Sequence, residues 1–164
     1  MTVIESTAII EPGAIIGKDC YIGHYAVIRP GVIIGDNSHI RAHCFIAADA
    51  RIGNNTQVMQ FSNICRNCII EDEVFVGMGC MTTNTKKIAY RRPYKDISEP
   101  PIIRRAARIG ARVTILPGVE IGENAVVGAG SLVHKSLASG YVFLGSPVTL
   151  IKKVPEDELI WILD

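Results

Sequence analysis

The sequence predicts an all-β fold, a parallel β-helix of hexapeptide repeats with one protruding loop and a short C-terminal helix. Three observations carry this prediction. A branched aliphatic residue returns at every sixth position from Ile4 to Val76. A small residue stands two positions before most of them, and glycine directly follows many of them. Neither the helical period of 3.6 nor strand alternation of two produces a six-residue period, whereas a parallel β-helix does.

Each hexad supplies one short strand and one corner, and three hexads close a triangular coil. The aliphatic residue points into the prism, where branched side chains pack well against their equivalents in the coils above and below. The position two residues earlier faces the same interior beside the corner, so a small side chain fits there. We expect the glycine after the aliphatic residue to supply backbone freedom at the bend.

The repeats fall into two blocks separated by an inserted loop. The first block has thirteen rungs, and the pattern falters at Thr82, which is polar. It resumes from Ile109 to Val133, which predicts eighteen rungs and about six coils. The spacing from Val76 to Ile109 is not a multiple of six, so we expect the segment of about 82–108 to leave the prism. Its prolines, which cannot serve in a central ladder, agree with this.

The inserted loop is rich in positive charge. It contains only Asp96 and Glu99 as acids against Lys86, Lys87, Arg91, Arg92, Lys95, Arg104, Arg105 and Arg108. Long structureless loops inside compact domains are usually functional, and a basic loop on a nearly neutral protein indicates an anionic partner such as phosphate. The alternative is a solvated flap that only contacts a neighbouring subunit.

The hexads stop after Val133, and we predict a β-helix domain over 1–154 and a helix over 155–164. Pro155 at the first position, followed by Glu156, Asp157 and Glu158, is typical of a helix start. The helix is too short to persist alone. Its apolar residues would cover the open end of the last coil or another protomer.

Bulk properties indicate a single globular domain. The formal net charge is +1, and 48% of the 164 residues are hydrophobic. No apolar run approaches the length of a membrane span, and the N-terminus lacks the regions of a signal peptide, so a cytoplasmic location is expected. Cys20, Cys44, Cys68 and Cys80 occupy inward positions and are expected as buried thiols. Cys65 should point outward, so we do not interpret its spacing to Cys68 as a redox pair.

The repeat pattern as a whole resembles the hexapeptide acyltransferases. The resemblance covers nearly the whole chain and includes the hexads, the loop, and two segments, Gly128-Ala129-Gly130-Ser131 and Leu144-Gly145-Ser146-Pro147-Val148. It implies a left-handed β-helix and a homotrimer. It also implies that acyl-CoA binds in the cleft between adjacent prisms, with the loop of one subunit reaching over a neighbouring site.

Within that superfamily the resemblance is to acetyl-CoA-dependent N-acetyltransferases acting on nucleotide-linked amino sugars. Three stretches carry it: Gly23-His24-Tyr25-Ala26-Val27-Ile28-Arg29, Glu71-Asp72-Glu73-Val74-Phe75-Val76-Gly77 and Thr82-Thr83-Asn84. The first is similar to their Trp-His-Phe-Ala-His-Val-Arg segment, the second to Glu-Asp-Asp-Val-Phe-Val-Gly, and the third to Phe-Thr-Asn-Asp. The chain departs from the family at 59–65, a segment that helps to line the acceptor pocket there.

The resemblance implies roles for individual residues, and it implies no metal. Direct attack of an amine on a thioester requires positioning, an oxyanion donor and a proton acceptor. Asn84 would hold the amine or polarise the thioester, and His24 would be the base or an acceptor contact. Arg29 and Gln60 would bind the acceptor. Coenzyme A would contact the backbone at Ala111 and Ala129, with phosphates near Lys135, Lys152 and Lys153.

Each of these residues also has a purely structural interpretation. Asn84 could be a loop-turn residue, His24 a surface or subunit-packing side chain, and the three lysines ordinary solvated charges.

Other function classes stay open. An O-acetyltransferase acting on a sugar or small alcohol shares the same fold. So do gamma-type zinc carbonic anhydrases, and His24 and His43 could lie at one corner with His39 nearby. However, the spacing of His39 and His43 differs from that family, and Gln60 and Cys65 stand where further ligands would be. A structural solenoid is a third possibility. Nucleic-acid binding is disfavoured because the basic loop has few aromatic residues and no known module.

Overall fold

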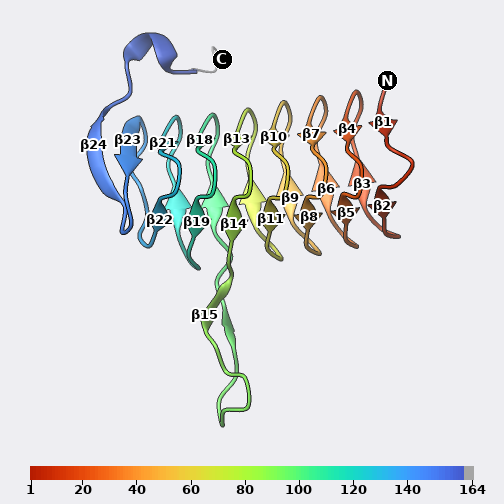
Figure 1. Cartoon of the computed structure of the whole chain (residues 1–164), viewed down its shortest axis with the longest axis horizontal. Helices are drawn as coiled ribbons and strands as arrows, with labels where there is room; N and C mark the ends of the chain where they lie inside the picture. Colours follow the sequence, from red (N-terminus) through yellow and green to blue (C-terminus); the bar gives the residue numbers. More distant parts are fainter. Residues whose placement is uncertain (161–164) are drawn as a thin grey trace.

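The computed structural model describes residues 1–160, and most of them form one triangular prism of stacked coils (Figure 1). Most strands are two residues long, and each pairs in parallel with its equivalents in the coils before and after it. Val3 lies beside Tyr21, and Tyr21 lies beside His39. The three columns of strands form the three faces of the prism. The fold is the parallel β-helix that the repeats predict, with the left hand that the family resemblance implies.

We name the faces A, B and C in the order in which the chain crosses them. Face A contains β1 (Val3–Ile4), β4 (Tyr21–Ile22), β7 (His39–Ile40), β10 (Gln57–Val58), β13 (Phe75–Val76), β18 (Arg108–Ile109), β21 (Val126–Val127), β23 (Tyr141–Leu144) and β24 (Thr149–Lys153). Face B contains β2 (Ile9–Ile10), β5 (Val27–Ile28), β8 (Phe45–Ile46), β11 (Asn63–Ile64), β14 (Met81–Thr82), β19 (Thr114–Ile115) and β22 (Leu132–Val133). Face C contains β3 (Ile15–Ile16), β6 (Ile33–Ile34), β9 (Arg51–Ile52), β12 (Ile69–Ile70), β17 (Ile102–Ile103) and β20 (Glu120–Ile121). The A–B, B–C and C–A corners are the bends that join these faces.

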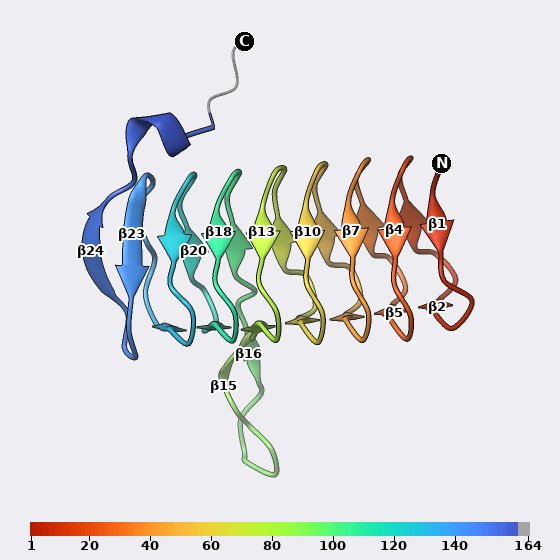
Figure 2. The same ribbon diagram turned by 45° about the horizontal axis from the view of Figure 1, so that its top comes forward.

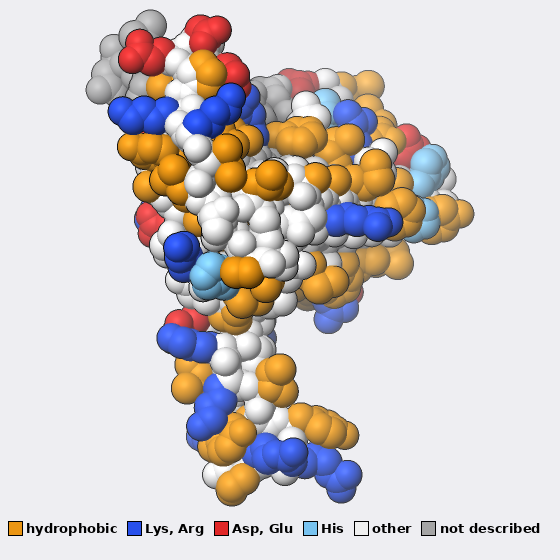
Figure 3. Space-filling model, turned by 60° about the vertical axis from the view of Figure 1, so that its left-hand side comes forward, with side chains coloured by type: hydrophobic (Ala, Val, Ile, Leu, Met, Phe, Trp, Pro, Cys, Tyr) orange, Lys and Arg blue, Asp and Glu red, His pale blue; other side chains and the backbone are white. Residues whose placement is uncertain are grey.

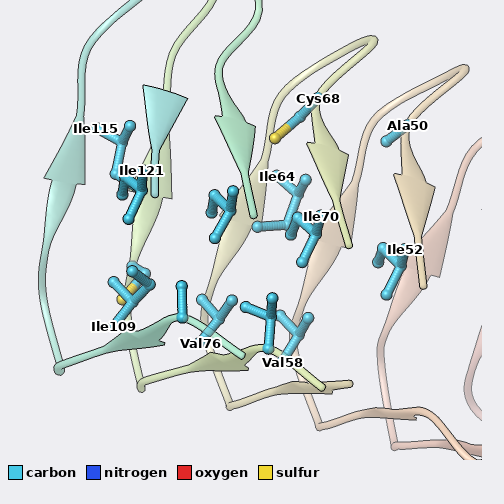
Figure 4. Close-up of a cluster of buried hydrophobic side chains, with 14 of the residues drawn as sticks. Ala50, Ile52, Val58, Ile64, Cys68, Ile70, Val76, Ile109, Ile115 and Ile121 are labelled. Carbon is cyan, nitrogen blue, oxygen red and sulfur yellow. The ribbon is translucent and has the colours of Figure 1, made fainter. Parts of the chain in front are cut away.

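The core is the column of aliphatic side chains inside the prism (Figure 4). The second residue of nearly every strand from β4 onward is buried, as at Ile22, Ile64 and Ile121. The small residues predicted to face inward are buried as well, among them Ala50 and Cys68. The first coil has no coil beneath it, so its inward residue Ile4 stays 46% exposed. The predicted register of the hexads is therefore confirmed.

Glycine follows the aliphatic residues for a different physical reason from the backbone freedom that we expected. Gly17, Gly35, Gly53 and Gly77 do not have positive φ. A Cβ added to any of them would lie within 3 Å of backbone atoms of the next coil. They permit the close approach of successive coils rather than a strained bend. The left-handed conformation occurs two residues later, as at Asn37 and Asn55.

The ladder runs further than the sequence pattern indicated. Thr82 is buried in β14, which pairs with Asn63 and Ile115 on either side in face B. Its hydroxyl oxygen accepts a hydrogen bond from the backbone N–H of Cys65 at 2.7 Å. The ladder resumes at Ile103, which pairs with Ile70. The β-branched shape of Thr82 fits the column, and its polar atom is satisfied locally, so a polar residue does not interrupt the prism here.

The segment that leaves the prism is therefore a hairpin inside the expected loop of 82–108. Its strands β15 (Thr85–Lys87) and β16 (Ile97–Ser98) are antiparallel. It leaves the B–C corner after β14 and projects away from the prism (Figures 1 and 2). Figure 3 shows Lys and Arg side chains along it, mixed with hydrophobic ones.

The positive charge of the hairpin is smaller than the sequence suggested. Arg104 lies in the prism, where it binds Glu71 and Glu120 at 2.8 and 2.9 Å. Arg108 is in β18 and binds Glu158 at 2.7 Å. On the hairpin, Lys86 binds Glu99 at 2.9 Å. On the hairpin, no ion pair within residues 1–160 involves Lys87, which lies over the Tyr94 ring, or Arg91, Arg92 and Lys95 near the tip.

The expected helix over 155–164 is not found over the part of it that the structure describes. A single 3-10 turn, η1 (Glu156–Glu158), follows Pro155, and Leu159 is extended. One turn cannot persist by itself, and the backbone of Ile160 is instead tied to the prism by hydrogen bonds with Asn124. The remainder of the predicted helix, 161–164, lies outside the described residues. Within residues 1–160, no helix has the length and apolar character needed to cross a membrane.

Adjacent positions in β6 test the register. Ile34 is 1% exposed and Ile33 is 38% exposed. We expect Ile34→Ala to lower the free energy of unfolding by about 2–5 kcal/mol, because it leaves a cavity in the stacked column. Ile33→Ala is the matched control, with an expected change of about 0.5 kcal/mol. Urea unfolding of the two variants measures both, and equal losses would contradict the inward and outward assignment.

Candidate functional site

A pocket lies at the base of the hairpin, on the B–C corner. Its volume is about 620 Å³. The prism contributes its floor and the hairpin one wall, and the lining residues are Cys65, Thr82, Thr83, Asn84, Thr85, Ile88, Tyr90, Asp96, Leu116 and Pro117. The lining is mainly apolar with a few polar groups, which is typical of small-molecule sites. The hairpin thus creates a sheltered volume that the flat faces of the prism cannot supply.

Asn84 lies where the chain turns from the prism into the hairpin. Its backbone carbonyl accepts a hydrogen bond from Glu99 N at 2.7 Å, which closes the base of the hairpin. Its side chain is held loosely: Nδ2 donates to Arg66 O at 3.3 Å, and Oδ1 accepts from Thr85 Oγ1 at 3.4 Å. Both contacts are long. The backbone is therefore fixed, while both ends of the amide can take better partners from a ligand.

Cys65 lies at the same pocket, beside Cys68. Both thiols are free. Cys65 faces the pocket and is covered by the hairpin, whereas Cys68 is fully buried in the core. The Cys68 thiol donates a hydrogen bond that lowers the pKa of Cys65, and the Thr82 side chain lowers it further. The same hydrogen bond, together with burial, raises the pKa of Cys68. The arrangement gives the pocket one thiol with increased thiolate character at neutral pH.

Four of the residues singled out from the sequence share one column of the A–B corner. His24, Gln60, Ala111 and Ala129 occupy equivalent positions in four different coils, and Ala42 and Met78 hold this position in the coils between them. Ala111 lines a hollow of about 260 Å³, and Ala129 lines one of about 280 Å³ beside it. The Gln60 side-chain oxygen is buried and has no hydrogen-bond partner within residues 1–160. The structure thus places the two alanines in successive coils of the A–B corner, and we call this strip of the corner, from Ala111 to Ala129, the track.

The other candidates lie elsewhere on the prism. Arg29 is at the B–C corner, where it forms an ion pair with Glu11 of the preceding coil. Lys135 is at the same corner as Asn84, two coils further along. Lys152 and Lys153 are exposed residues of β24, which pairs with β23 at the C-terminal end of the stack. No single protomer brings all the candidates to one place.

His24 and Asn84 are separated within the chain. His24 follows β4 at the A–B corner, and Asn84 follows β14 at the B–C corner, three coils further along. Three coils correspond to roughly 14 Å along the prism axis. The His24 ring is within hydrogen-bonding distance of Thr7 Oγ1, at 2.8 Å, and its other nitrogen is 3.4 Å from Glu5. A direct proton transfer between His24 and a group held by Asn84 does not fit this geometry.

The histidines of the zinc alternative do not converge in one protomer. The His43 ring lies between Tyr25 and Phe61, and His39 packs edge-on against Tyr21 on face A. Over the described part of the chain, no three His, Cys, Asp or Glu side chains are placed to share a metal ion.

Sequence reasoning missed Cys65, Ile88, Tyr90 and Asp96 as pocket residues. The hairpin residues follow no six-residue period, so the repeat gives no information on where they pack. The signal for Cys65 was present, because it directly follows the inward Ile64 at the corner that carries the insertion.

Thiol reactivity tests the local chemistry. At pH 7 we expect iodoacetamide to modify Cys65 before the other cysteines, since the pKa of Cys65 is lowered. Burial raises the pKa of Cys44 to about 11, and it also raises the pKa of Cys80. Peptide mass spectrometry over a time course measures this. Cys65→Ala should abolish the fast reaction and Cys44→Ala should preserve it. A fast reaction that survives in Cys65→Ala contradicts the assignment.

Comparison with known proteins gives the family. The chain matches the family described as bacterial transferase hexapeptide (six repeats) at residues 13–48, 49–84 and 100–135. Galactoside O-acetyltransferase of Lactococcus lactis is 44% identical over 107 residues, which are 60% of this chain and 52% of that protein. A 2,3,4,5-tetrahydropyridine-2,6-dicarboxylate N-acetyltransferase of Clostridium perfringens is 43% identical over 65 residues, 37% of this chain and 28% of that one. The chain spans about half or less of the length of these relatives.

Solved structures show the same fold. A mutant of AntD, an N-acyltransferase from Bacillus cereus in complex with dTDP and coenzyme A, has a TM-score of 0.77 at 24% identity, over 87% of this chain and 84% of that chain. A maltose O-acetyltransferase from Clostridium difficile has a TM-score of 0.62 at 23% identity, over 87% and 70%. At such identities the likeness concerns the fold alone. The family match covers more than half of the residues, and this chain belongs to the bacterial transferase hexapeptide family.

Proposed function

We propose that this protein transfers an acetyl group from acetyl-CoA to the amino group of a nucleotide-linked amino sugar by direct attack on the thioester. The observation that carries the proposal is the position of Asn84, whose weakly engaged amide lines the pocket at the base of the hairpin. The likeness in fold to AntD, whose crystal contains dTDP and coenzyme A, supports the choice of donor and acceptor class.

Asn84 has two uses in this reaction. Its Nδ2 donates a hydrogen bond to the oxygen of the thioester carbonyl, where negative charge develops as the amine attacks. Its Oδ1 accepts a hydrogen bond from the attacking amine and so holds it in line. Asp96 is the carboxylate of the pocket, and its negative charge attracts an amino group to this volume. His24 has no part in this scheme because it lies three coils from Asn84 along the prism axis. As the C–N bond forms and the C–S bond breaks, the departing thiolate of coenzyme A takes the proton that the amine loses.

The proposed assembly is a homotrimer in which each site combines two protomers. The B–C corner supplies the pocket with Asn84, while the A–B corner supplies the track with Ala111 and Ala129 for coenzyme A. Face B lies between these corners. Its outward residues are uncharged: Ile9, Val27, Phe45, Asn63, Met81, Thr114 and Leu132. An uncharged face is suited to burial against a neighbour.

The phosphates of coenzyme A would lie toward the C-terminal end of the track. Lys152 and Lys153 in β24 are exposed there, and we propose them as the phosphate contacts, with Lys135 at the adjoining B–C corner. Arg29 and Gln60 remain proposed acceptor contacts. A cytoplasmic location is also part of the proposal, because all five cysteines are free thiols, which suits a reducing compartment.

O-acetylation is the second candidate. The observation in its favour is the likeness to galactoside O-acetyltransferase, at 44% identity over 107 residues. A hydroxyl nucleophile must lose its proton during attack and so needs a general base more than an amine does. The acceptor assay distinguishes the two, since an amide product resists mild alkali and an ester does not.

Asn84→Ala tests the catalytic assignment. We expect turnover to fall by about 10²–10³-fold, as for loss of an oxyanion donor, with the KM for acetyl-CoA changed less than about threefold. Free thiol release from acetyl-CoA, with amino-sugar nucleotides as acceptors, measures both. Arg51→Ala, on the exposed side of β9 in face C, is the control. Unchanged turnover in Asn84→Ala removes this residue from the mechanism.

Ligand-dependent melting tests the donor. Acetyl-CoA at one hundred times its Kd should raise the melting temperature by about 5–10 °C, because a ligand that binds only the folded protein stabilises it. Zinc at the same excess over protein should leave it unchanged. A rise with zinc and none with acetyl-CoA would overturn the acetyltransferase in favour of a metal-dependent activity.

A further inference from the structure

Three rings form an exposed stack along the A–B corner. Tyr25, His43 and Phe61 occupy equivalent positions in successive coils. The centroids of Tyr25 and His43 are 5.0 Å apart, and those of His43 and Phe61 are 4.9 Å apart. The planes of the last pair differ by only 6°. These separations equal the distance between coils, so each ring lies flat upon the next.

The stack ends at Phe61 because the next position holds Gly79. The following position along the corner is Arg112, so one side chain is missing between the Phe61 ring and the Arg112 side chain. The backbone passes through this gap in regular register: Gly79 N donates to Gln60 O, and Arg112 N donates to Met78 O, both at 2.8 Å. The missing side chain leaves a slot of about 260 Å³ lined by Phe61, Met78, Gly79, Ala111 and Arg112.

The slot has the dimensions of one planar ring. Phe61 and Arg112 belong to coils two apart, which corresponds to roughly 9–10 Å. A flat ring placed midway would lie about 5 Å from each, the same spacing as in the stack below it. A Cβ added at Gly79 would be 3.6 Å from Arg112 Cγ and would meet no other atom within 4 Å. The space in front of the glycine is therefore bounded by the aliphatic stem of Arg112, which the added atom would touch without a clash.

The backbone at this column also indicates a function. The position requires positive φ, which is 57° at Tyr25, 59° at His43 and 61° at Phe61. At the other two corners Gly, Asn or Asp holds most of the equivalent positions. Bulky residues adopt this conformation at a steric cost. Strained positions of this kind cluster at ligand sites, and three aromatic residues in succession are not needed for the turn itself.

We infer that the slot between Phe61 and Arg112 binds a nucleobase, which stacks on Phe61 in the place of the side chain that Gly79 lacks. Arg112 forms no side-chain hydrogen bond or ion pair within residues 1–160, and its guanidinium both stacks on flat rings and donates to carbonyl or phosphate oxygens. Stacking on aromatic rings is the usual way in which proteins hold an unpaired base.

The inference deepens the proposed function and rests on it for the source of the base. Acetyl-CoA and a nucleotide-linked acceptor both carry one. The lysines proposed for the phosphates of coenzyme A lie at the C-terminal end of the prism, whereas Gly79 lies three coils before β23. The part of this hollow between Phe61 and Arg112 is thus assigned to the base of the acceptor, beside the backbone of Ala111 that is proposed for coenzyme A. The adenine of coenzyme A becomes an outcome that the test distinguishes.

Two variants remove the slot in opposite ways. Phe61→Ala takes away its floor. Gly79→Phe fills it with a fourth ring, and the backbone tolerates this because φ is 66° at Gly79 and 61° at Phe61. Gly79→Ala is the matched control for strain without filling, since Ala106 in this chain has a φ of 56°. Tyr25→Ala, two coils below, is the control for loss of an exposed ring. Melting temperatures establish that each variant is folded.

Calorimetric titrations with dTDP, UDP, coenzyme A and acetyl-pantetheine, which lacks adenine, give the result. We expect Phe61→Ala and Gly79→Phe to weaken nucleoside diphosphate binding about tenfold to a hundredfold, and both controls to stay within threefold. Weakened coenzyme A binding with unchanged nucleoside diphosphate and acetyl-pantetheine binding would assign the slot to adenine instead. Unchanged binding of every probe in both slot variants, or no nucleotide binding to the unaltered protein, overturns the inference. Acetyl-pantetheine binding and turnover by the unaltered protein report separately on the proposed acetyl transfer.

Discussion

Everything in this molecule depends on the close stacking of one coil on the next. The backbone ladder sets a fixed distance between coils, and the glycines after the aliphatic residues allow it, since a Cβ at Gly35 or Gly53 would overlap the next coil. The same stacking puts each inward side chain directly on its equivalent, which favours a repeated branched aliphatic shape. One constraint thus determines the backbone, the core and the composition of the corners.

Stacking also turns sequence periodicity into columns of side chains on the outside. A column can be inert, as where Asn37 and Asn55 satisfy the turn, or it can carry chemistry, as where Tyr25, His43 and Phe61 stack. The prism alone offers only shallow hollows. The hairpin changes this at one corner, because its apolar side chains and Asp96 enclose a volume above Asn84. The candidate chemistry is therefore located where the periodic structure is interrupted.

The sequence predicted the periodic part of the structure well because a six-residue period has a single structural meaning. It missed the rungs at Thr82 and Ile103 because inward positions were expected to be apolar and in phase, whereas a threonine satisfied by Cys65 N–H fits the column. The short C-terminal helix was predicted from local signals, and contacts with Asn124 hold the described part of that segment in another conformation.

The candidate site was only partly predictable. Asn84 was found through resemblance, and the pocket around it contains hairpin residues whose packing no repeat encodes. His24 was drawn from the same resemblance, and its place follows from counting hexads: it falls on a different corner from Asn84. The ring column could have been found by listing every eighteenth residue.

The position of the hairpin has a consequence for how such a chain can change its length. Eighteen residues make one coil, so inserting or deleting eighteen before Thr82 moves the hairpin along the prism by about 4.8 Å and keeps it on the same corner. A change of six residues also preserves every inward side chain and would fold equally well. It would, however, turn everything downstream by one third of a turn and carry Asn84 to another corner. A requirement for folding alone would therefore accept a change of six residues as readily as a change of eighteen. In the proposed trimer, the requirement for the neighbouring subunit to meet the hairpin separates them, so related chains that differ in length should differ by whole coils.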